Sequence, residues 1–115
     1  WWERYKGEAE LARIVQELFP DHVMERNIRM ASMEGYELDI YLPELGLAFE
    51  YNGAQHYRPI DFFGGLSAFQ KIQMRDQKRK QLCEANGIRL VAIRFDEKIS
   101  KESVESRIRA IGIKI

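Results

Sequence analysis

The sequence predicts an α/β fold, an α+β arrangement with one central mixed β-sheet flanked by helices. Helical and strand apolar patterns alternate along the chain in the order α-β-β-β-α-β-α. The chain has 115 residues and 45% hydrophobic content, which suffices for one domain with a modest core. We therefore expect a single domain over residues 1–115. Its abrupt, tryptophan-led start favours a domain excised from a longer chain.

The first predicted element is a helix within residues 6–20. Leu11, Ile14, Val15 and Leu18 recur at helical spacing, and Pro20 ends the run. Residues 22–30 form a weaker strand candidate.

Two strands with a tight turn follow in residues 36–52. In YELDIYL, apolar residues alternate with Glu37, Asp39 and Tyr41, and GLAFEYN alternates in the same way. The expected apolar face carries the following residues: Tyr36, Leu38, Ile40, Leu42, Leu47, Phe49 and Tyr51. The residues PELG between the strands are typical of a turn.

The second half of the chain predicts a loop, a helix, a strand and a helix. Ser67 and Gln70 have the spacing of a capping box, and the helix they open is expected to end near Asn86. IRLVAIRF, residues 88–95, is almost continuously apolar, which predicts a central strand. Ser100 is the expected N-cap of the last helix. In the loop, the pair Phe62–Phe63 is expected to anchor the core.

Composition excludes several functional classes. No apolar run is long enough to cross a membrane, and one cysteine with two histidines argues against a zinc finger. The single cysteine, Cys83, favours a core role in a reducing, cytoplasmic compartment. Net charge is zero, but residues 1–50 carry 5 basic and 11 acidic side chains, so the basic residues concentrate in the second half.

An unusual feature of the strand pair is its two acids. If the turn spans residues 43–46, Leu42 faces Leu47, and Asp39 then faces Glu50. Directly opposed like charges destabilise a sheet, with β-carbons about 5 Å apart. A magnesium ion would compensate, since magnesium favours one or two carboxylates with water and phosphate oxygens. The alternative is that both acids simply face solvent.

The residues after the second acid strengthen the prediction of a site. Asn52 continues the polar face, Gly53 permits a sharp bend, and Gln55 and His56 follow at the same edge. Histidine is the usual side chain for moving a proton near neutral pH. The backbone carbonyl of Tyr51 is a further candidate metal ligand.

Three segments together resemble the PD-(D/E)XK nuclease superfamily. They are GEAELARIV, LDIYLPELGLAFEYNGAQHY and RDQKRKQLCEANGIRLVAIRF, and they span most of residues 7–96. The closest resemblance is to very-short-patch repair endonucleases, their bacterial relatives and certain phage homing endonucleases. The resemblance implies a restriction-endonuclease-like core and a bacterial or phage-encoded intracellular enzyme.

The resemblance also implies roles for particular residues. Asp39 and Glu50 would bind Mg²⁺, for which Mn²⁺ would substitute, and Glu8 would complete the site. Many members carry a lysine where this chain has Asn52, so proton transfer passes by resemblance to His56, with Gln55 as helper. Asp76 would orient His56 or complete a second cation site. The implied activity is hydrolysis of DNA phosphodiester bonds, as nicking or cleavage.

A basic segment precedes the strand predicted for residues 88–95. It carries the following cations: Lys71, Arg75, Lys78, Arg79 and Lys80. Lysine and arginine contacts to phosphate dominate the affinity of proteins for nucleic acid, so this helix is a candidate DNA-binding surface. A solvated helix face is the alternative. By resemblance, Phe62 and Phe63 would intercalate into DNA. A homodimer or an additional DNA-targeting domain would supply specificity.

Three other functions stay open on the sequence. The first is a catalytically inactive nuclease-like module that binds DNA or protein, which Asn52 favours. The second is an RNA-directed nuclease, although no RNA-binding motif is present. The third is a structural interaction domain with two exposed acids.

Overall fold

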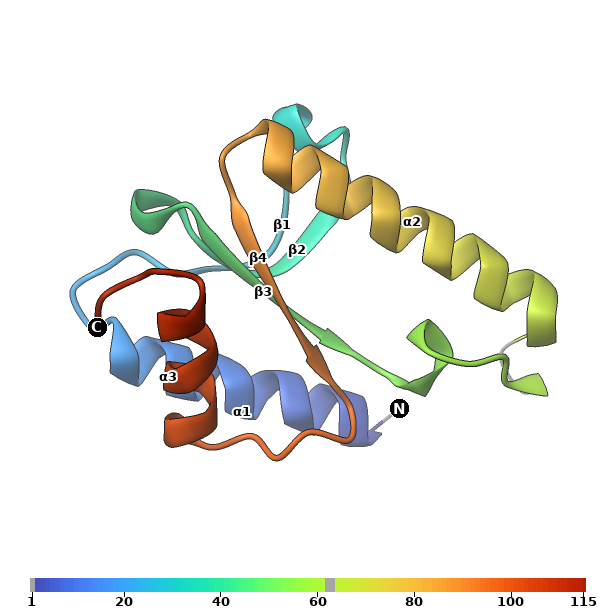
Figure 1. Ribbon diagram of the computed structural model, residues 1–115, viewed down its shortest axis with the longest axis horizontal. Helices are drawn as coiled ribbons and strands as arrows, with labels where there is room; N and C mark the ends of the chain where they lie inside the picture. The colour runs from blue at the N-terminus through green and yellow to red at the C-terminus, as the bar shows by residue number, and fades with distance from the viewer. Residues whose placement is uncertain (1, 62–63) are drawn as a thin grey trace.

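The computed structural model describes the backbone of residues 2–61 and 64–115, and the side chains of residues 6–61 and 64–115. The predicted order of elements is confirmed, with short 3-10 helices (η) in three of the connections (Figure 1). The elements are α1 (Trp2–Leu18), β1 (Glu25–Arg29), η1 (Ala31–Met33), β2 (Glu37–Leu42), η2 (Pro43–Leu45), β3 (Leu47–Asn52), η3 (Ala54–His56), α2 (Gly65–Ala85), β4 (Arg89–Arg94) and α3 (Lys101–Ala110). The side chains of Trp1, Trp2, Phe62 and Phe63, and the roles expected for them, lie outside the described residues.

The four described strands form one mixed sheet in the order β1-β2-β3-β4, which confirms the predicted α/β class. β1 and β2 pair antiparallel, as do β2 and β3, whereas β3 and β4 pair parallel. The prediction that residues 88–95 form a central strand is wrong, because β4 lies at one end of this strand order. β4 is apolar because its side chains pack into clusters on both faces of the sheet, and not because it has a strand on each side.

Helices cover the two faces of the sheet unequally. α1 and α3 lie together on one face, and α2 lies on the other (Figure 1). The larger apolar cluster lies between the sheet and the α1–α3 layer, and its largest fully buried members include Phe49, Leu11 and Ile14. The second cluster, on the α2 face, is smaller and includes Met33, Leu82 and Cys83. The α2 face therefore leaves room for a polar site.

The predicted register of the hairpin is confirmed at its turn end. Leu42 pairs with Leu47 and Ile40 with Phe49. Beyond Ile40 the ladder ends, and the backbone N–H of Tyr51 donates instead to the Asp39 carboxylate, with N and Oδ2 3.1 Å apart. The side chain of Asp39 thus takes the place of strand backbone, and β2 and β3 part at this residue.

The parting of the strands changes which side chains share a face. Tyr36 and Leu38 belong to the second cluster with Met33, whereas Ile40 belongs to the first. The expected single apolar face from Tyr36 to Leu42 is therefore wrong at its first two positions. Strict alternation requires a continuous ladder, and here β2 pairs with β3 only from Ile40 to Leu42.

α2 is buried only near its C-terminal end. Among its described residues, Leu82 and Cys83 are the buried ones, and the N-terminal part extends beyond the sheet in Figure 1. The helix begins at Gly65, and its N-cap Gly64 has a φ of 93° without a side-chain cap. The predicted Ser67 cap is therefore wrong, because the chain bends at Gly64, three residues earlier. The predicted Ser100 cap of α3 is confirmed.

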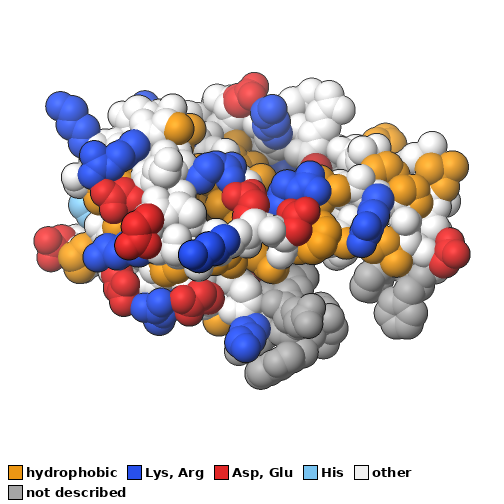
Figure 2. Space-filling view, turned by 60° about the horizontal axis from the view of Figure 1, so that its bottom comes forward, with side chains coloured by type: hydrophobic (Ala, Val, Ile, Leu, Met, Phe, Trp, Pro, Cys, Tyr) orange, Lys and Arg blue, Asp and Glu red, His pale blue; other side chains and the backbone are white. Residues whose placement is uncertain are grey.

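The outer surface of the α1–α3 layer mixes both signs of charge. Figure 2 shows Lys and Arg side chains interspersed with Asp and Glu on this face. Arg13 pairs there with Glu10 and Glu17, and Arg109 pairs with Glu105. This pattern is typical of a solvated face and not of a surface for a polyanion. In the described part of the chain, every helix is too short or too polar to span a membrane.

Candidate active site

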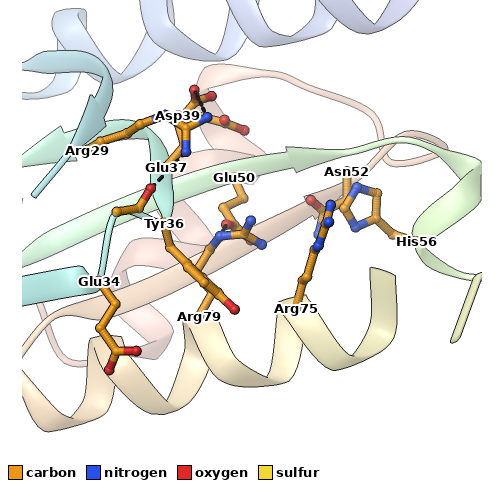
Figure 3. Close-up of a pocket in the computed structure, with 11 residues that line it drawn as sticks. Arg29, Glu34, Tyr36, Glu37, Asp39, Glu50, Asn52, His56, Arg75 and Arg79 are labelled. Atoms are coloured by element: carbon orange, nitrogen blue, oxygen red, sulfur yellow. Dashed lines mark hydrogen bonds and ion pairs between the residues drawn. The ribbon is translucent and has the colours of Figure 1, made fainter. Parts of the chain in front are cut away.

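An open pocket of about 580 Å³ lies between the sheet and α2 (Figure 3). Strand residues supply Asp39, Glu50 and Asn52, and η3 supplies His56. α2 supplies Arg75 and Arg79 from the opposite wall. The pocket therefore brings together five of the predicted site residues, namely Asp39, Glu50, Asn52, His56 and Arg75, with Arg79 as a sixth.

The two acids of the hairpin lie at the base of this pocket. Asp39 is 7% exposed and Glu50 is 6% exposed, although both are charged residues on strands. They lie on the same side of the sheet, as predicted, at the point where β2 and β3 part. Buried carboxylates need compensating charge or hydrogen bonds. Asp39 has the Tyr51 amide, and Glu50 has a cation described below.

A histidine that lines the pocket pairs with an aspartate behind it. His56 Nδ1 lies 2.7 Å from Asp76 Oδ2, across the gap between η3 and α2. His56 is largely buried, and its ring edge lines the pocket. Of the two roles predicted for Asp76, the structure therefore has the orienting one. Asp76 holds the Nδ1 side of the ring, and His56 lines the pocket.

Arg79 has a place that the sequence analysis did not give it. Its Nε lies 2.9 Å from Glu50 Oε1, and its Nη1 lies 3.0 Å from Asp76 Oδ1. Its guanidinium also lies over the Tyr36 ring, 5.7 Å from the centroid. We expected Arg79 on a DNA-binding helix surface beside the metal site. In the structure it lines the pocket and also links two acidic groups, Glu50 and Asp76.

A signal for this placement is present in the sequence. Arg79 lies three and four residues before Leu82 and Cys83, and Arg75 lies four residues before Arg79. Residues at these spacings share one helix face. Because Leu82 and Cys83 are the apolar residues that anchor α2, both arginines had to face the sheet.

Cys83 packs beside the site without taking part in it. Burial raises the pKa of its thiol to about 11, and the charge of Glu50 adds to this shift. The thiol therefore stays protonated at neutral pH and is not a nucleophile. The predicted core role of Cys83 is confirmed by its 1% exposure.

Asn52 and Gln55 differ in their relation to the pocket. Asn52 lines the pocket, and its Nδ2 donates to the Tyr57 hydroxyl at 3.4 Å. Gln55 is not among the lining residues, and its side chain folds over Gly53. A Cβ at position 53 would lie 2.5 Å from Gln55 Oε1, so a larger residue there would displace the end of the Gln55 side chain. The structure does not bring Gln55 together with the two acids.

Glu8 also lies off the pocket wall. Its Oε1 accepts from Asn27 Nδ2 at 3.1 Å and lies 3.6 Å from a guanidinium nitrogen of Arg26. Asn27 Nδ2 is also 3.4 Å from Glu37 Oε1, and Glu37 lines the pocket. Within the described residues, no group of three or more histidine, cysteine or acidic side chains is placed to hold a metal ion. The candidate metal ligands are therefore the pair Asp39 and Glu50.

The remaining predicted DNA-binding residues lie along α2. Arg75 points into the pocket (Figure 3). Lys71 is exposed, and Lys78 is exposed with its Nζ 3.7 Å from Glu34 Oε2. A basic strip thus runs from the pocket to the outer part of α2.

Comparison with known proteins finds viral relatives that are themselves uncharacterized. The chain is 34% identical over 77 residues to uncharacterized protein 307L of Invertebrate iridescent virus 6, covering 66% of this chain and 39% of that protein. It is 38% identical over 65 residues to uncharacterized protein 033L of Invertebrate iridescent virus 3, covering 56% and 34%. It is 36% identical over 64 residues to uncharacterized protein 094L of Frog virus 3, covering 54% and 41%.

The chain thus spans about two fifths or less of the length of these relatives. No protein-family model matches the chain. No solved structure matches it either.

Proposed function

We propose that this chain is a magnesium-dependent endonuclease domain of the PD-(D/E)XK type that hydrolyses DNA. The main support is the arrangement of Asp39 and Glu50. Both acids are buried on neighbouring strands, at the point where the strands part, and both line a pocket that also contains His56. A small domain loses stability by burying two carboxylates, so their placement favours a functional reason.

The residues present fit a magnesium ion. Magnesium needs hard oxygen donors and is often held by one or two carboxylates with water and phosphate oxygens. Asp39 and Glu50 would hold it, with the Tyr51 carbonyl as a further candidate ligand. When bound, the ion would supply Lewis acidity and lower the pKa of a bound water. Mn²⁺ takes the same donors and would substitute.

His56 is the residue we assign to proton transfer. Because Asp76 holds Nδ1 at 2.7 Å, the neutral ring carries its proton on that nitrogen and has Nε2 as an acceptor. Nε2 can take a proton from the attacking water, or return one to the leaving oxygen. Asn52 is placed to bind water or phosphate in the same pocket. Gln55 and Glu8 would act through their neighbours.

Substrate binding is assigned to the cations of α2. Arg75 would contact phosphate within the pocket, and Lys71 and Lys78 would extend the contact along the strand. The proposed setting is the cytoplasm, since a chain with one cysteine fits a reducing compartment. An additional targeting domain or a homodimer would set the sequence preference.

An inactive binding module is the second candidate. Asn52 stands where a lysine is common in the superfamily, and a guanidinium already lies against Glu50. In this reading the pocket binds DNA or protein without turnover.

The deciding experiment compares wild type with Glu50→Gln on supercoiled plasmid, in Mg²⁺ or Mn²⁺. The proposal predicts nicked or linear product with wild type, and at least about a thousandfold slower conversion with the variant. A matched single-stranded RNA substrate tests the RNA-directed alternative. Folded wild type that converts neither substrate would favour the binding module. Equal conversion of plasmid by both proteins would contradict the assigned site.

A further inference from the structure

Arg79 connects two parts of the proposed site that have different tasks. Its Nε lies 2.9 Å from Glu50, the proposed metal ligand. Its Nη1 lies 3.0 Å from Asp76, which holds His56 at 2.7 Å. Arg79 and Asp76 both lie on α2, so the contact with Glu50 joins this helix to β3, and the contact of Asp76 with His56 joins it to η3. A single cation therefore links the metal ligand to the histidine pair.

The contact between Arg79 and Glu50 is strong in charge but poor in geometry. The guanidinium is 17% exposed and Glu50 is 7% exposed at its side chain, so water screens the pair only partly. Yet the buried Nε–H finds no hydrogen-bond acceptor among the described residues, because it does not point along the short line to Oε1. Arg79 thus neutralises Glu50 through its charge, and its Nε–H adds no hydrogen bond to the pair.

A divalent cation would compete for the same carboxylate. Magnesium on Glu50 would replace the guanidinium as the neutralising charge, and two cations on one carboxylate repel each other. Arg79 would keep its contact with Asp76 and would turn its free N–H groups toward the pocket that it lines. A phosphodiester is the ligand in this pocket that these donors suit.

We propose that Arg79 is an exchangeable counter-ion of Glu50, which a divalent cation displaces and which then binds the substrate phosphate. This inference rests on the proposed nuclease function. Before loading, Arg79 keeps the acidic pocket folded and competes with the cation. After loading, it contacts the substrate while still positioning Asp76 and His56. Metal and DNA then strengthen each other's binding, by reciprocity of coupled equilibria.

The first test is a calorimetric titration of the protein with Mn²⁺ in the absence of DNA. Arg79→Gln removes the competing charge, and we expect it to bind the ion about tenfold more tightly than wild type. Arg79→Lys keeps the charge but loses the fork that reaches both acids, and about threefold tighter binding is expected. Arg79→Lys is therefore the variant to measure if Arg79→Gln does not fold.

Arg75 offers a matched control, because it lines the same pocket and forms no ion pair with the described side chains of residues 6–61 and 64–115. Arg75→Gln lowers the general positive potential alone, and we expect a gain in Mn²⁺ affinity below about threefold. Arg75→Lys should match wild type. Equal effects of the two glutamine variants would overturn the exchange and leave the nuclease proposal standing. No Mn²⁺ binding to any of these proteins would overturn both.

The second test concerns the substrate and needs no turnover. Fluorescence anisotropy in EDTA measures the affinity for a DNA duplex in wild type, Glu50→Gln, Arg79→Gln and the double variant. Glu50→Gln frees Arg79, so it should tighten DNA binding at least about threefold more when Arg79 is present than when it is absent. If the effects of the two substitutions on the free energy of DNA binding were additive, the proposal that Arg79 binds the substrate phosphate would be contradicted.

Discussion

The two faces of β3 have the same burial and opposite chemistry. All six residues of the strand are buried. Phe49 and Tyr51 point to the α1–α3 layer and join the larger apolar cluster. Glu50 and Asn52 point to α2 and line the pocket. Burial on the first face is achieved by packing, and on the second face by ion pairs and hydrogen bonds around a cavity.

The cause of the difference is how each helix meets the sheet. α1 and α3 cover their face with side chains of the larger cluster, whereas α2 places its buried residues only near its C-terminal end. Ahead of Leu82, α2 presents arginines to the sheet. The same strand can therefore serve as core on one side and as the base of a site on the other.

The largest expected effect breaks the packed face. Phe49 is fully buried, and Phe49→Ala should lower the free energy of unfolding by about 4 kcal/mol, since a large cavity would remain. Urea unfolding followed by circular dichroism measures this change. Glu44→Ala, at an exposed turn residue, is the control and should change stability by less than about 1 kcal/mol. A loss below about 1 kcal/mol for Phe49→Ala would contradict the assignment of the core.

A second prediction breaks the polar face and spares the fold. His56→Ala should lower the rate of plasmid nicking about a hundredfold, because the proton-transfer group is lost. Asp76→Asn keeps a partner for His56 but weakens its orientation, so about a tenfold loss is expected. Single-turnover rates at saturating Mg²⁺ measure both, with Gln77→Ala on the outer side of α2 as control. A larger loss for Asp76→Asn than for His56→Ala would contradict the order of roles.

A third prediction concerns the thiol of Cys83, which lies in the smaller apolar cluster near Glu50. Its folded pKa of about 11 lies above the ordinary 9.0, so the folded state holds the proton more tightly than the unfolded state. The resulting stability is complete below pH 9 and is lost as pH rises toward 11, by about 2 kcal/mol. Unfolding curves between pH 8 and about pH 11 measure this loss. Cys83→Ala should have a smaller slope over this range; an identical slope would contradict the prediction.

The smallest expected effect sharpens the role of the outer part of α2. Lys71→Gln with Lys78→Gln should reduce the slope of log affinity for DNA against log salt by about 2, if each lysine contacts one phosphate. Anisotropy titrations over a range of salt concentrations give the slope. Exchanging Lys101 and Lys114 for glutamine, outside α2, is the matched control and should leave it unchanged. A slope that moves equally in both double variants would remove α2 as the DNA-binding surface.

Much of the fold could be predicted from local patterns. The helix in residues 6–20, the two strands in residues 36–52 and the Ser100 cap depend on neighbours in sequence, and the structure has all of them. The alternation within residues 36–42 fails only at Tyr36 and Leu38. The position of β4 at the end of the strand order could not be read in this way. Apolar side chains on both faces of a strand indicate two covering layers, but they do not indicate how many strands lie beside it.

The site was predicted in its parts more than in its connections. Asp39, Glu50 and His56 were named from strand alternation and from the residues that follow the strand. The pairing of His56 with Asp76 joins residues 20 positions apart, and the sequence analysis gave it as one of two roles. The contacts of Arg79 with Glu50 and Asp76 were not predicted, because a run of charges hides which face of a helix turns inward. That orientation is set by tertiary packing of Leu82 and Cys83.

α2 forms one wall of the pocket and is held by packing only near its C-terminal end. The packed end lies at Leu82 and Cys83, and about 25 Å of helix precedes it at 1.5 Å per residue. A tilt of the helix by about 5° around this packed end would move its N-terminus by about 2 Å. Arg79, one turn from the packed end, would move by about half an ångström. In the proposed nuclease, the entrance would thus adjust to the width of a bound strand while Glu50 and His56 keep their alignment with Arg79.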